Sequence, residues 1–195
     1  MMSADGRRFP AEPLDRAEVE AILDAPSRRA PTGGRNRALL ALLHRTGLRI
    51  GEALDLEVGD YDRGRGSVTV RRGKGGKPRV AGGIDDRARA ELECWLAARP
   101  PGARHLFCTL AGGRLGEGYA RAMVKRAARR AGVERRVHPH AFRHTLAREL
   151  VEEGFDLALI RDQLGHASIA TTDHYVAAVA PSRRLEALRS RRRAA

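Results

Sequence analysis

Six residues stand out in this sequence because their types, taken together, could carry out phosphoryl transfer without a metal. Four of them fall within one C-terminal stretch, residues 138–177, and two lie upstream. Arginine donates paired hydrogen bonds to phosphate oxygens, and a phenol oxygen can attack phosphorus when a nearby base or cation favours its deprotonation. The six residues are Arg49, Lys74, His140, Arg143, His166 and Tyr175.

The two arginines and the tyrosine predict how a phosphodiester would be held and attacked. Attack adds negative charge to an anionic centre, so fixed donors such as Arg49 and Arg143 lower the barrier, and loss of one donor typically costs about 10²–10³ in rate. Tyr175 is the candidate nucleophile. Its phenol, with an ordinary pKa near 10, needs a proton acceptor or a positive field, which His140 or His166 can supply. Taken singly, a lone arginine or tyrosine is more often a surface, ion-pair or packing residue, so the hypothesis rests on their conjunction.

A lysine on a hairpin turn completes the set. Lys74 lies in the turn GKGG and is a candidate general acid for the leaving 5′ oxygen. Lys77, which follows that turn, is the rival candidate. Both lysines could instead serve only to make the turn soluble.

The clustered histidines raise the alternative of a metal site. His138, His140 and His144 lie close together, but two of them flank a proline and no HExxH pattern is present. The segment GKGGKP also lacks the glycine spacing and the Ser or Thr of a phosphate-binding loop. We therefore expect no metal, no ATP and no other cofactor.

Charge and composition narrow the class of partner. The chain has 195 residues with 37 Lys+Arg against 24 Asp+Glu, a formal net charge of +13 that favours a nucleic-acid partner over a merely solvated basic surface. Aromatic residues are few, at 4%, which argues against binding by base stacking. The two cysteines form no CxxC pair, no signal peptide is evident, and the longest aliphatic run, residues 38–43, is too short to span a bilayer. These features predict a cytoplasmic, nucleoid-associated protein without membrane contact.

Periodicity and capping signals predict a mainly α fold with a small antiparallel β-hairpin sheet (α+β). Asp15 and Glu18 form a predicted capping box, and Gly47 is the predicted stop of an apolar helix, so that Arg49 opens the next short helix. A strand at 67–72, the GKGG turn and a return strand at the sheet edge, marked by Pro78, form the hairpin. The longer helices are predicted at 35–46, 84–98, 116–131, 140–154, 156–165 and 168–175.

Basic side chains form a stripe on one predicted helix. Arg121, Lys125 and Arg129 follow one another at i, i+4 and i+8. Such a stripe can be a solvated face or can contact a DNA backbone, and the net charge keeps the second reading open. We assign predicted backbone contacts to these three residues and to Lys77 and Arg79 beside the hairpin.

Five short segments, in order, resemble the signature blocks of the tyrosine recombinases, also called phage integrases. They are TGLRIGE, GKGGK, HAFRHTLA, LGHAS and TTDHYVA, and the resemblance covers residues 14–190. The family's catalytic arginine, lysine, histidine, arginine, histidine and tyrosine fall on the six residues named above. Glu52 and His144 match positions that are structural or that support the catalytic groups.

The resemblance implies a site-specific DNA recombinase that cuts and rejoins DNA through a 3′-phosphotyrosine intermediate. Tyr175 would attack, the arginines and histidines would stabilise the phosphorane, and Lys74 would protonate the leaving oxygen. It also implies double-stranded DNA as substrate and a tetramer on DNA, with a partner recombinase or an accessory DNA-bending protein as a further possibility. Integration, excision and inversion are all compatible with the sequence.

The sequence departs from the family pattern in two respects. VAGGID, residues 80–85, replaces the Val-Pro-Leu that typically ends the return strand. We also predict a flexible leader at 1–10, a catalytic domain at 11–180, a basic helix or tail at 181–195 and no N-terminal core-binding domain. The chain in this respect resembles the fimbrial phase-variation invertases, although a fragment of a longer integrase fits equally well.

Two other functions remain open at this stage. A type IB topoisomerase shares the same catalytic groups but relaxes DNA without a defined site. A DNA-binding accessory protein or degenerate relative would bind without catalysis. Loss of covalent chemistry in a Tyr175→Phe variant separates the catalytic readings from the second alternative.

Overall fold

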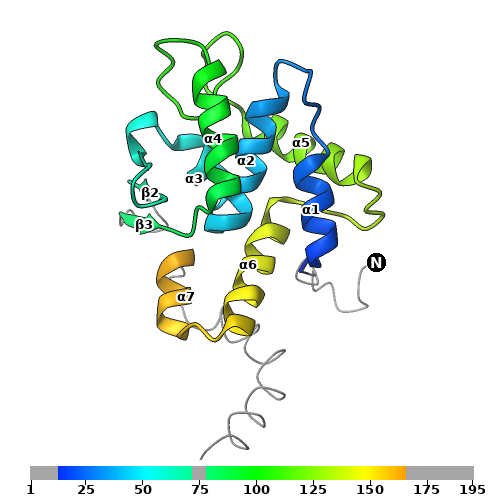
Figure 1. The fold of residues 1–195 in the computed structure, drawn as a ribbon, viewed down its shortest axis with the longest axis vertical. Helices are drawn as coiled ribbons and strands as arrows, with labels where there is room; N and C mark the ends of the chain where they lie inside the picture. The colour runs from blue at the N-terminus through cyan, green and yellow to red at the C-terminus, as the bar shows by residue number, and fades with distance from the viewer. Residues whose placement is uncertain (1–12, 72–77, 166–195) are drawn as a thin grey trace, which may run out of the picture.

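In the part of the chain that this computed structural model describes, residues 13–71 and 78–165, a small antiparallel sheet lies at one side of a group of helices (Figure 1). The helices are α1 (Arg16–Asp24), α2 (Gly33–Thr46), α3 (Ile50–Asp55), α4 (Asp86–Ala98), α5 (Glu117–Arg130), α6 (Pro139–Glu153) and α7 (Leu157–Leu164). A 3-10 turn, η1 (Val58–Asp60), leads into the strands β1 (Tyr61–Asp62), β2 (Ser67–Val70) and β3 (Arg79–Ala81). The predicted mainly α fold with a small antiparallel sheet is confirmed.

Helix α2 is the centre of the fold. It contacts α1, α3, α4 and α6, and its leucines at 39, 40, 42 and 43 are fully buried. Most of α2 is buried on all sides, so its buried arginines, Arg35 and Arg37, need hydrogen-bond partners inside the protein. Arg37 does so by pairing with Glu91 of α4 at 2.9 Å, and Arg35 donates to the carbonyl of Cys108 at 3.1 Å. The elements that carry Arg49, His140 and Arg143 are therefore placed relative to one buried helix.

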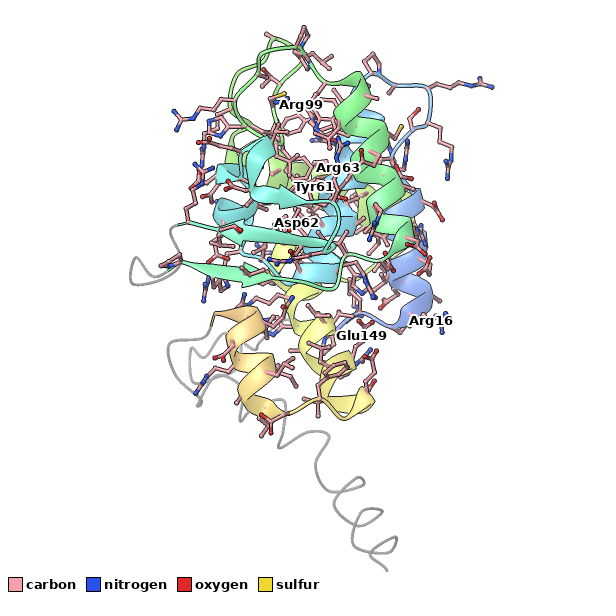
Figure 2. All side chains as sticks on the ribbon, turned by 60° about the vertical axis from the view of Figure 1, so that its left-hand side comes forward. Arg16, Tyr61, Asp62, Arg63, Arg99 and Glu149 are labelled. Carbon is pink, nitrogen blue, oxygen red and sulfur yellow. The ribbon has the colours of Figure 1, made fainter. Side chains whose placement is uncertain are left out.

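The sheet has the strand order β1-β2-β3, with Val68 opposite Tyr61 on one side and Ala81 on the other. In Figure 2 the strands lie side by side, with Tyr61 and Asp62 on the outer strand and α7 next to β3. β3 is an edge strand, as predicted. Two details were not predicted: β1 was missed, and β2 ends at Val70 instead of residue 72. In this register Arg71 would face Pro78, which has no N–H to donate to the ladder.

The helix boundaries follow the predicted signals closely. Asp15 and Glu18 form the expected reciprocal capping box of α1. α2 begins two residues earlier than predicted, at Gly33. A side chain at this position would meet the carbonyl oxygen of Ser27 at 1.7 Å, so only glycine allows the first turn to pack there. A glycine that is read as a loop residue in sequence can therefore begin a helix.

Helices α6 and α7 enclose a second, smaller hydrophobic cluster next to the sheet. Leu146 and Ala147 of α6 pack on Ile160 and Leu164 of α7 in a small apolar cluster of their own. α7 also contacts β3, so it bridges α6 and the hairpin. Within residues 13–71 and 78–165, no helix has the length and apolar character needed to cross a bilayer.

Candidate active site

Arg49 lies at a sharp turn between α2 and α3, as predicted. α2 ends at Gly47, whose φ of 63° is in the left-handed region. A Cβ at Gly47 would lie 2.5 Å from Leu164 Cδ2, so glycine permits both the helix stop and the close approach of α7. The turn leaves Arg49 at the N-cap of α3 with its side chain 27% exposed. The guanidinium is held by the protein and still reachable from solvent.

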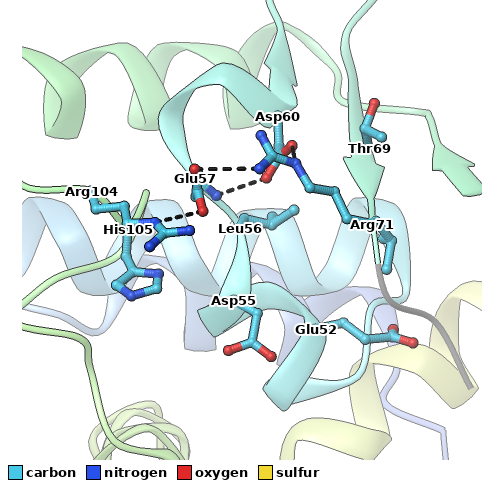
Figure 3. Close-up of a pocket in the computed structure, with 10 residues that line it drawn as sticks. Glu52, Asp55, Leu56, Glu57, Asp60, Thr69, Arg71, Arg104 and His105 are labelled. Atoms are coloured by element: carbon cyan, nitrogen blue, oxygen red, sulfur yellow. Dashed lines mark hydrogen bonds and ion pairs between the residues drawn. The ribbon is translucent and has the colours of Figure 1, made fainter. Parts of the chain in front are cut away.

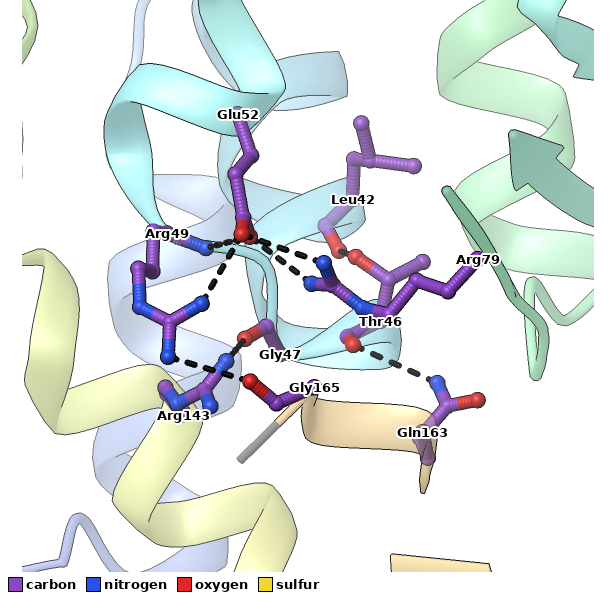
Figure 4. Close-up of polar contacts among 9 residues, drawn as sticks. All are labelled: Leu42, Thr46, Gly47, Arg49, Glu52, Arg79, Arg143, Gln163 and Gly165. Carbon is purple, nitrogen blue, oxygen red and sulfur yellow. Dashed lines mark hydrogen bonds and ion pairs between the residues drawn. The ribbon is translucent and has the colours of Figure 1, made fainter. Parts of the chain in front are cut away.

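Glu52 anchors two arginines at once (Figure 4). One turn into α3, its carboxylate accepts from the Arg49 backbone N–H at 2.9 Å and from Arg49 Nη1 at 2.9 Å. It also accepts a fork of two bonds from Arg79 of β3, at 3.1 and 2.8 Å. The Glu52 side chain is only 8% exposed. The fork from Arg79 fixes the direction of the carboxylate, and the carboxylate orients Arg49 through one guanidinium and one backbone hydrogen bond.

The charge of Glu52 is retained despite its burial. Burial by itself would raise the pKa of the carboxyl, but hydrogen bonds from Arg79 and Arg49 outweigh it and lower the pKa below the usual 4.5. Because the folded-state pKa is lowered, the carboxylate stabilises the fold above the unfolded-state pKa, and that stabilisation is lost as pH falls through the folded-state value.

A Glu52→Gln variant is therefore expected to lose about 2–3 kcal/mol of unfolding free energy at pH 7, because two buried guanidinium groups lose their counter-ion. The difference from the wild type should be constant at neutral pH and shrink as pH falls below 4.5, the ordinary value for this group. Urea unfolding at a series of pH values measures it. Glu117→Gln is the control, since Glu117 pairs with Arg121 on the surface and should cost under about 0.5 kcal/mol. A Glu52→Gln deficit that stays the same from neutral to acid pH would contradict the assignment.

Arg143 comes from the first turns of α6 and is almost entirely buried, at 6% exposure. Its Nη1 donates to the carbonyl of Gly47 at 2.7 Å. Its Nη2 is buried and has no hydrogen-bond partner within residues 13–71 and 78–165. Burial and the nearby positive charge of Arg49 lower the pKa of Arg143 to about 9, which leaves it protonated at neutral pH. Arg143 is thus a buried cation whose Nη2 has no partner among the described residues, and such a donor can bind an anion.

The end of α7 closes the site from the other side. Arg49 Nη2 donates to the carbonyl of Gly165 at 3.2 Å. Gly165 has φ 64°, and a Cβ there would lie 2.7 Å from the Arg79 guanidinium carbon. Glycine is therefore needed for the chain to pass over both arginines. His166 follows directly in the sequence and lies outside the described residues.

His140 lies one turn before Arg143 on α6, with its residue exposed. Partial shielding of the ring from water and the charges of His138, Arg143 and Arg49 lower the pKa of His140 below 6.5. At neutral pH the imidazole is therefore neutral and able to accept a proton. His138, His140 and His144 form a row of edge-on rings, with centroids 6.1 and 6.3 Å apart. In the described part of the chain, no set of three His, Cys, Asp or Glu residues is arranged to hold a metal ion.

Comparison with known proteins assigns this arrangement to a family. The sequence profile described as "Phage integrase family" matches residues 12–180. The chain belongs to this family. It is 38% identical over 180 residues to tyrosine recombinase XerD of Mycobacterium tuberculosis, covering 87% of this chain and 57% of that protein. It is also 38% identical over 170 residues to tyrosine recombinase XerC of Xanthomonas campestris, covering 87% and 52%. The chain thus spans little more than half the length of these phage integrase relatives.

Solved structures of family members confirm the fold. The XerA recombinase superposes with a TM-score of 0.78 at 27% identity, covering 95% of this chain and 67% of that one. The XerH site-specific recombinase, in a post-cleavage complex with its palindromic difH substrate, gives a TM-score of 0.77 at 30% identity, covering 96% and 55%. The resemblance to tyrosine recombinases that the signature segments indicated is thereby confirmed.

The predicted basic stripe lies on the outer face of α5. Arg121, Lys125 and Arg129 are exposed, while Val124 and Ala128 face the core. Arg121 forms an ion pair with Glu117 one turn before it. Such exposed side chains can exchange an internal partner for a phosphate at little cost. Contact of the stripe with DNA remains a prediction.

A pocket of about 280 Å³ lies next to the site, and Glu52 is one of its lining residues (Figure 3). Its walls are strongly charged, but their carboxylates already have partners. Figure 3 shows Glu57 between Arg71 and Arg104, with Arg104 Nε 2.8 Å away, and Asp60 bound to Arg71. The hydrogen bond from Arg104 lowers the pKa of Glu57. The pocket therefore adds no free charged group to the candidate site.

The structure brings together part of the predicted set. Arg49, Arg143 and Glu52 meet around the end of α2, and His140 lies on the α6 turn before Arg143. The residues Lys74, Lys77, His166 and Tyr175, the predicted helix at 168–175, and the segments 1–10 and 181–195 lie outside the described residues. The Arg79 side chain, 12% exposed, pairs with the Glu52 carboxylate. The predicted contact of Arg79 with DNA stays a prediction.

Sequence reasoning named Glu52 as a supporting residue but missed the contacts of Arg79 and Gln163. Arg79 was assigned to the DNA surface, whereas its contact in the structure is with Glu52. Gln163 was not singled out, although it links α7 to two other segments. Arg79 lies on a strand beside the helix that carries Glu52. This neighbourhood exists only in three dimensions, so the sequence alone held no signal for the pair.

Proposed function

We propose that this chain carries the catalytic domain of a site-specific DNA recombinase that cuts and rejoins DNA through a 3′-phosphotyrosine intermediate, without metal or ATP. The observation that carries the proposal is the pair of guanidinium groups at the end of α2. Arg143 is buried with an unused Nη2 donor, and Arg49 is oriented by Glu52 with part of its side chain open to solvent. Two guanidinium groups that lie close together and are held by the protein suit an oxyanion with several oxygens.

The roles of the residues follow from their protonation states. Tyr175 Oη would attack phosphorus and form a phosphotyrosine bond, while the bond to the 5′ oxygen breaks. The phenol proton would pass to a neutral imidazole, His140 or His166, and the low pKa of His140 supports this role. Lys74 would donate a proton to the leaving 5′ oxygen. Arg49 and Arg143 would hold the nonbridging oxygens throughout.

Rejoining would use the same groups in reverse. The phosphotyrosine bond keeps the energy of the broken linkage, so a 5′ hydroxyl from a partner duplex can reseal the strand without ATP. The exposed stripe of Arg121, Lys125 and Arg129 would bind the DNA backbone, and binding should weaken steeply with salt. Integration, excision and inversion are compatible with this chemistry, and the protein would act at the nucleoid.

The proposed assembly is a tetramer on two DNA duplexes, alone or with a partner recombinase or an accessory DNA-bending protein. Deletion of residues 181–195 is expected to reduce formation of the multi-protomer DNA complex about tenfold or more, because linked contacts between protomers are lost. Cleavage of a single suicide site should change much less. Gel-shift titration measures the first and denaturing gels the second.

The C-terminal segment combines Leu185 and Leu188 with several arginines. A Leu185→Ser/Leu188→Ser variant keeps its charge and tests whether the apolar side chains mediate the assembly. If the deletion reduced assembly and cleavage to the same extent, the segment would serve the active site itself and not the contact between protomers.

The proposed function is tested with a nicked suicide DNA substrate cut from the DNA that flanks its own gene. Cleavage releases a short strand from this substrate, so the covalent complex accumulates. We expect an adduct on a denaturing gel, and mass spectrometry of the digested adduct should place the DNA on Tyr175. DNA binding without any adduct would favour the accessory-protein alternative. Relaxation of an arbitrary plasmid by a single protomer would favour a type IB topoisomerase.

A further inference from the structure

The side chain of Gln163 connects three segments that meet at the site (Figure 4). Its Oε1 accepts from the Gly82 backbone N–H at 3.0 Å, and its Nε2 donates to the Gly82 carbonyl at 2.9 Å. The same Nε2 donates to the Thr46 carbonyl at 3.2 Å. Both amide hydrogens and one lone pair of the carboxamide are thus used. The reversed amide would place N–H against N–H and C=O against C=O, so this orientation is fixed.

Gln163 binds Gly82 in the way that one strand binds the next. The N–H and the C=O of a single residue both face the carboxamide, as in a hydrogen-bonded pair of an antiparallel ladder. β3 is an edge strand, and Gly82 is the residue directly after it. A side chain of α7 therefore continues the sheet where the backbone pairing stops.

The segments joined by Gln163 are those that carry or support the two arginines. Thr46 is the last residue of α2 and precedes Gly47, whose carbonyl binds Arg143. Two residues after Gln163, the carbonyl of Gly165 accepts from Arg49. A shift of α7 along β3 would move Gly165 relative to both guanidinium groups. It would also move the start of the segment that contains His166.

We propose that Gln163 is a positioning residue, which holds the end of α7 in register with β3 and α2 so that the guanidinium groups of Arg49 and Arg143 stay aligned. The inference rests on the proposed function. It assigns to Gln163 no contact with DNA and no proton transfer.

Gly82 makes this contact through its backbone N–H, and a proline at position 82 would have no N–H to donate to Gln163 Oε1. The φ of Gly82 is not positive, and a Cβ at this position would meet nothing within 4 Å. Neither the backbone conformation nor crowding requires glycine at 82. What the position uses is its N–H.

The first test compares single-turnover cleavage with DNA affinity. Gln163→Met keeps the length of the side chain and removes all three hydrogen bonds. We expect the rate of adduct formation at saturating protein to fall about tenfold to a hundredfold, the scale of a misplaced catalytic group. The Kd for the same DNA should stay within about twofold, because the interaction lost is not a binding contact.

A matched pair of variants at Gly82 isolates one bond. Gly82→Pro removes the N–H, while Gly82→Ala keeps it and has room for the methyl group. The proline variant should be slowed and the alanine variant should match the wild type. The double variant Gln163→Met/Gly82→Pro should be no slower than Gln163→Met alone, because both changes remove the same contact. Additive losses would show that Gln163 does not act through Gly82.

Amide exchange of the Gly82 N–H, followed by NMR, gives a readout that does not depend on catalysis. We expect protection in the wild type and faster exchange in Gln163→Met. An unprotected Gly82 amide in the wild type, or an unchanged cleavage rate in a Gln163→Met protein, would overturn the inference. Absence of adduct in the wild type itself would overturn the proposed function instead, and the exchange result would still report on the contact.

Discussion

A Tyr175→Phe variant is expected to bind DNA as the wild type does and to form no covalent adduct. The change removes one oxygen, the only atom that the proposed mechanism uses for attack, so the expected loss is complete within the detection of the gel. In the proposed mechanism the phenol proton of Tyr175 passes to His140 or His166 while Arg49 and Arg143 hold the nonbridging oxygens, so no other group replaces the lost oxygen. The measurement is adduct formation on the suicide substrate beside a gel-shift titration with the same DNA.

Tyr61 offers the matched control. It lies in β1, is 7% exposed and belongs to the main core. Tyr61→Phe also removes a phenol hydroxyl, but from a core tyrosine that takes no part in the proposed reaction, so adduct formation should persist. If Tyr175→Phe still forms the adduct, the nucleophile is another residue. If neither the wild type nor the variant forms it while both bind DNA, the chain acts by binding alone.

Arg143→Met is expected to slow adduct formation by about 10²–10³ and yet to leave the protein as stable as the wild type or more so. The guanidinium is buried, and none of the ion pairs found in residues 13–71 and 78–165 includes it. Its desolvation is therefore offset only in part, by the Gly47 carbonyl and the more distant charge of Glu52. Methionine fills a similar volume without that cost. Rates on the suicide substrate and urea unfolding measure the two effects.

Arg37→Met should behave in the opposite way. Arg37 is also buried on the central helix, but it pairs with Glu91 at 2.9 Å. Removing it leaves that carboxylate without its partner, which should cost about 3 kcal/mol, while the cleavage rate per folded molecule changes little. If Arg143→Met lowered the unfolding free energy as much as Arg37→Met, the contacts of Arg143 would have to offset its desolvation in full. Arg143 would then be a structural residue.

Local signals in the sequence predicted most of the fold. The pair Asp15 and Glu18 marks a helix start by reciprocal hydrogen bonds within one turn, and Gly47 marks a stop because the left-handed conformation favours glycine. These interactions involve neighbours in the chain, so their residue types suffice to predict them. The two-residue strand β1 was missed because so short a segment has no period of its own and depends on pairing with β2.

The candidate site was predictable in its chemical groups but not in its construction. Arg49, His140 and Arg143 could be named because their types and order suit one reaction. The contact between Glu52 and Arg79 joins residues 27 apart, and that between Gly82 and Gln163 joins residues 81 apart. Contacts over such separations leave no periodic trace in a single sequence. They depend on how α3, β3 and α7 pack, which the sequence determines only as a whole.

The burial of α2 has a consequence for how the site can fluctuate. Eleven of its fourteen residues are buried, and the turn that bears Arg49 and the carbonyl that holds Arg143 both lie at its end. Partial opening of the molecule exposes segments with few apolar contacts, whereas a buried central helix opens only when the whole cooperative unit does. Arg49 and the carbonyl that binds Arg143 are thus attached to the last segment to open. Described segments with fewer apolar contacts can open while these two points keep their places.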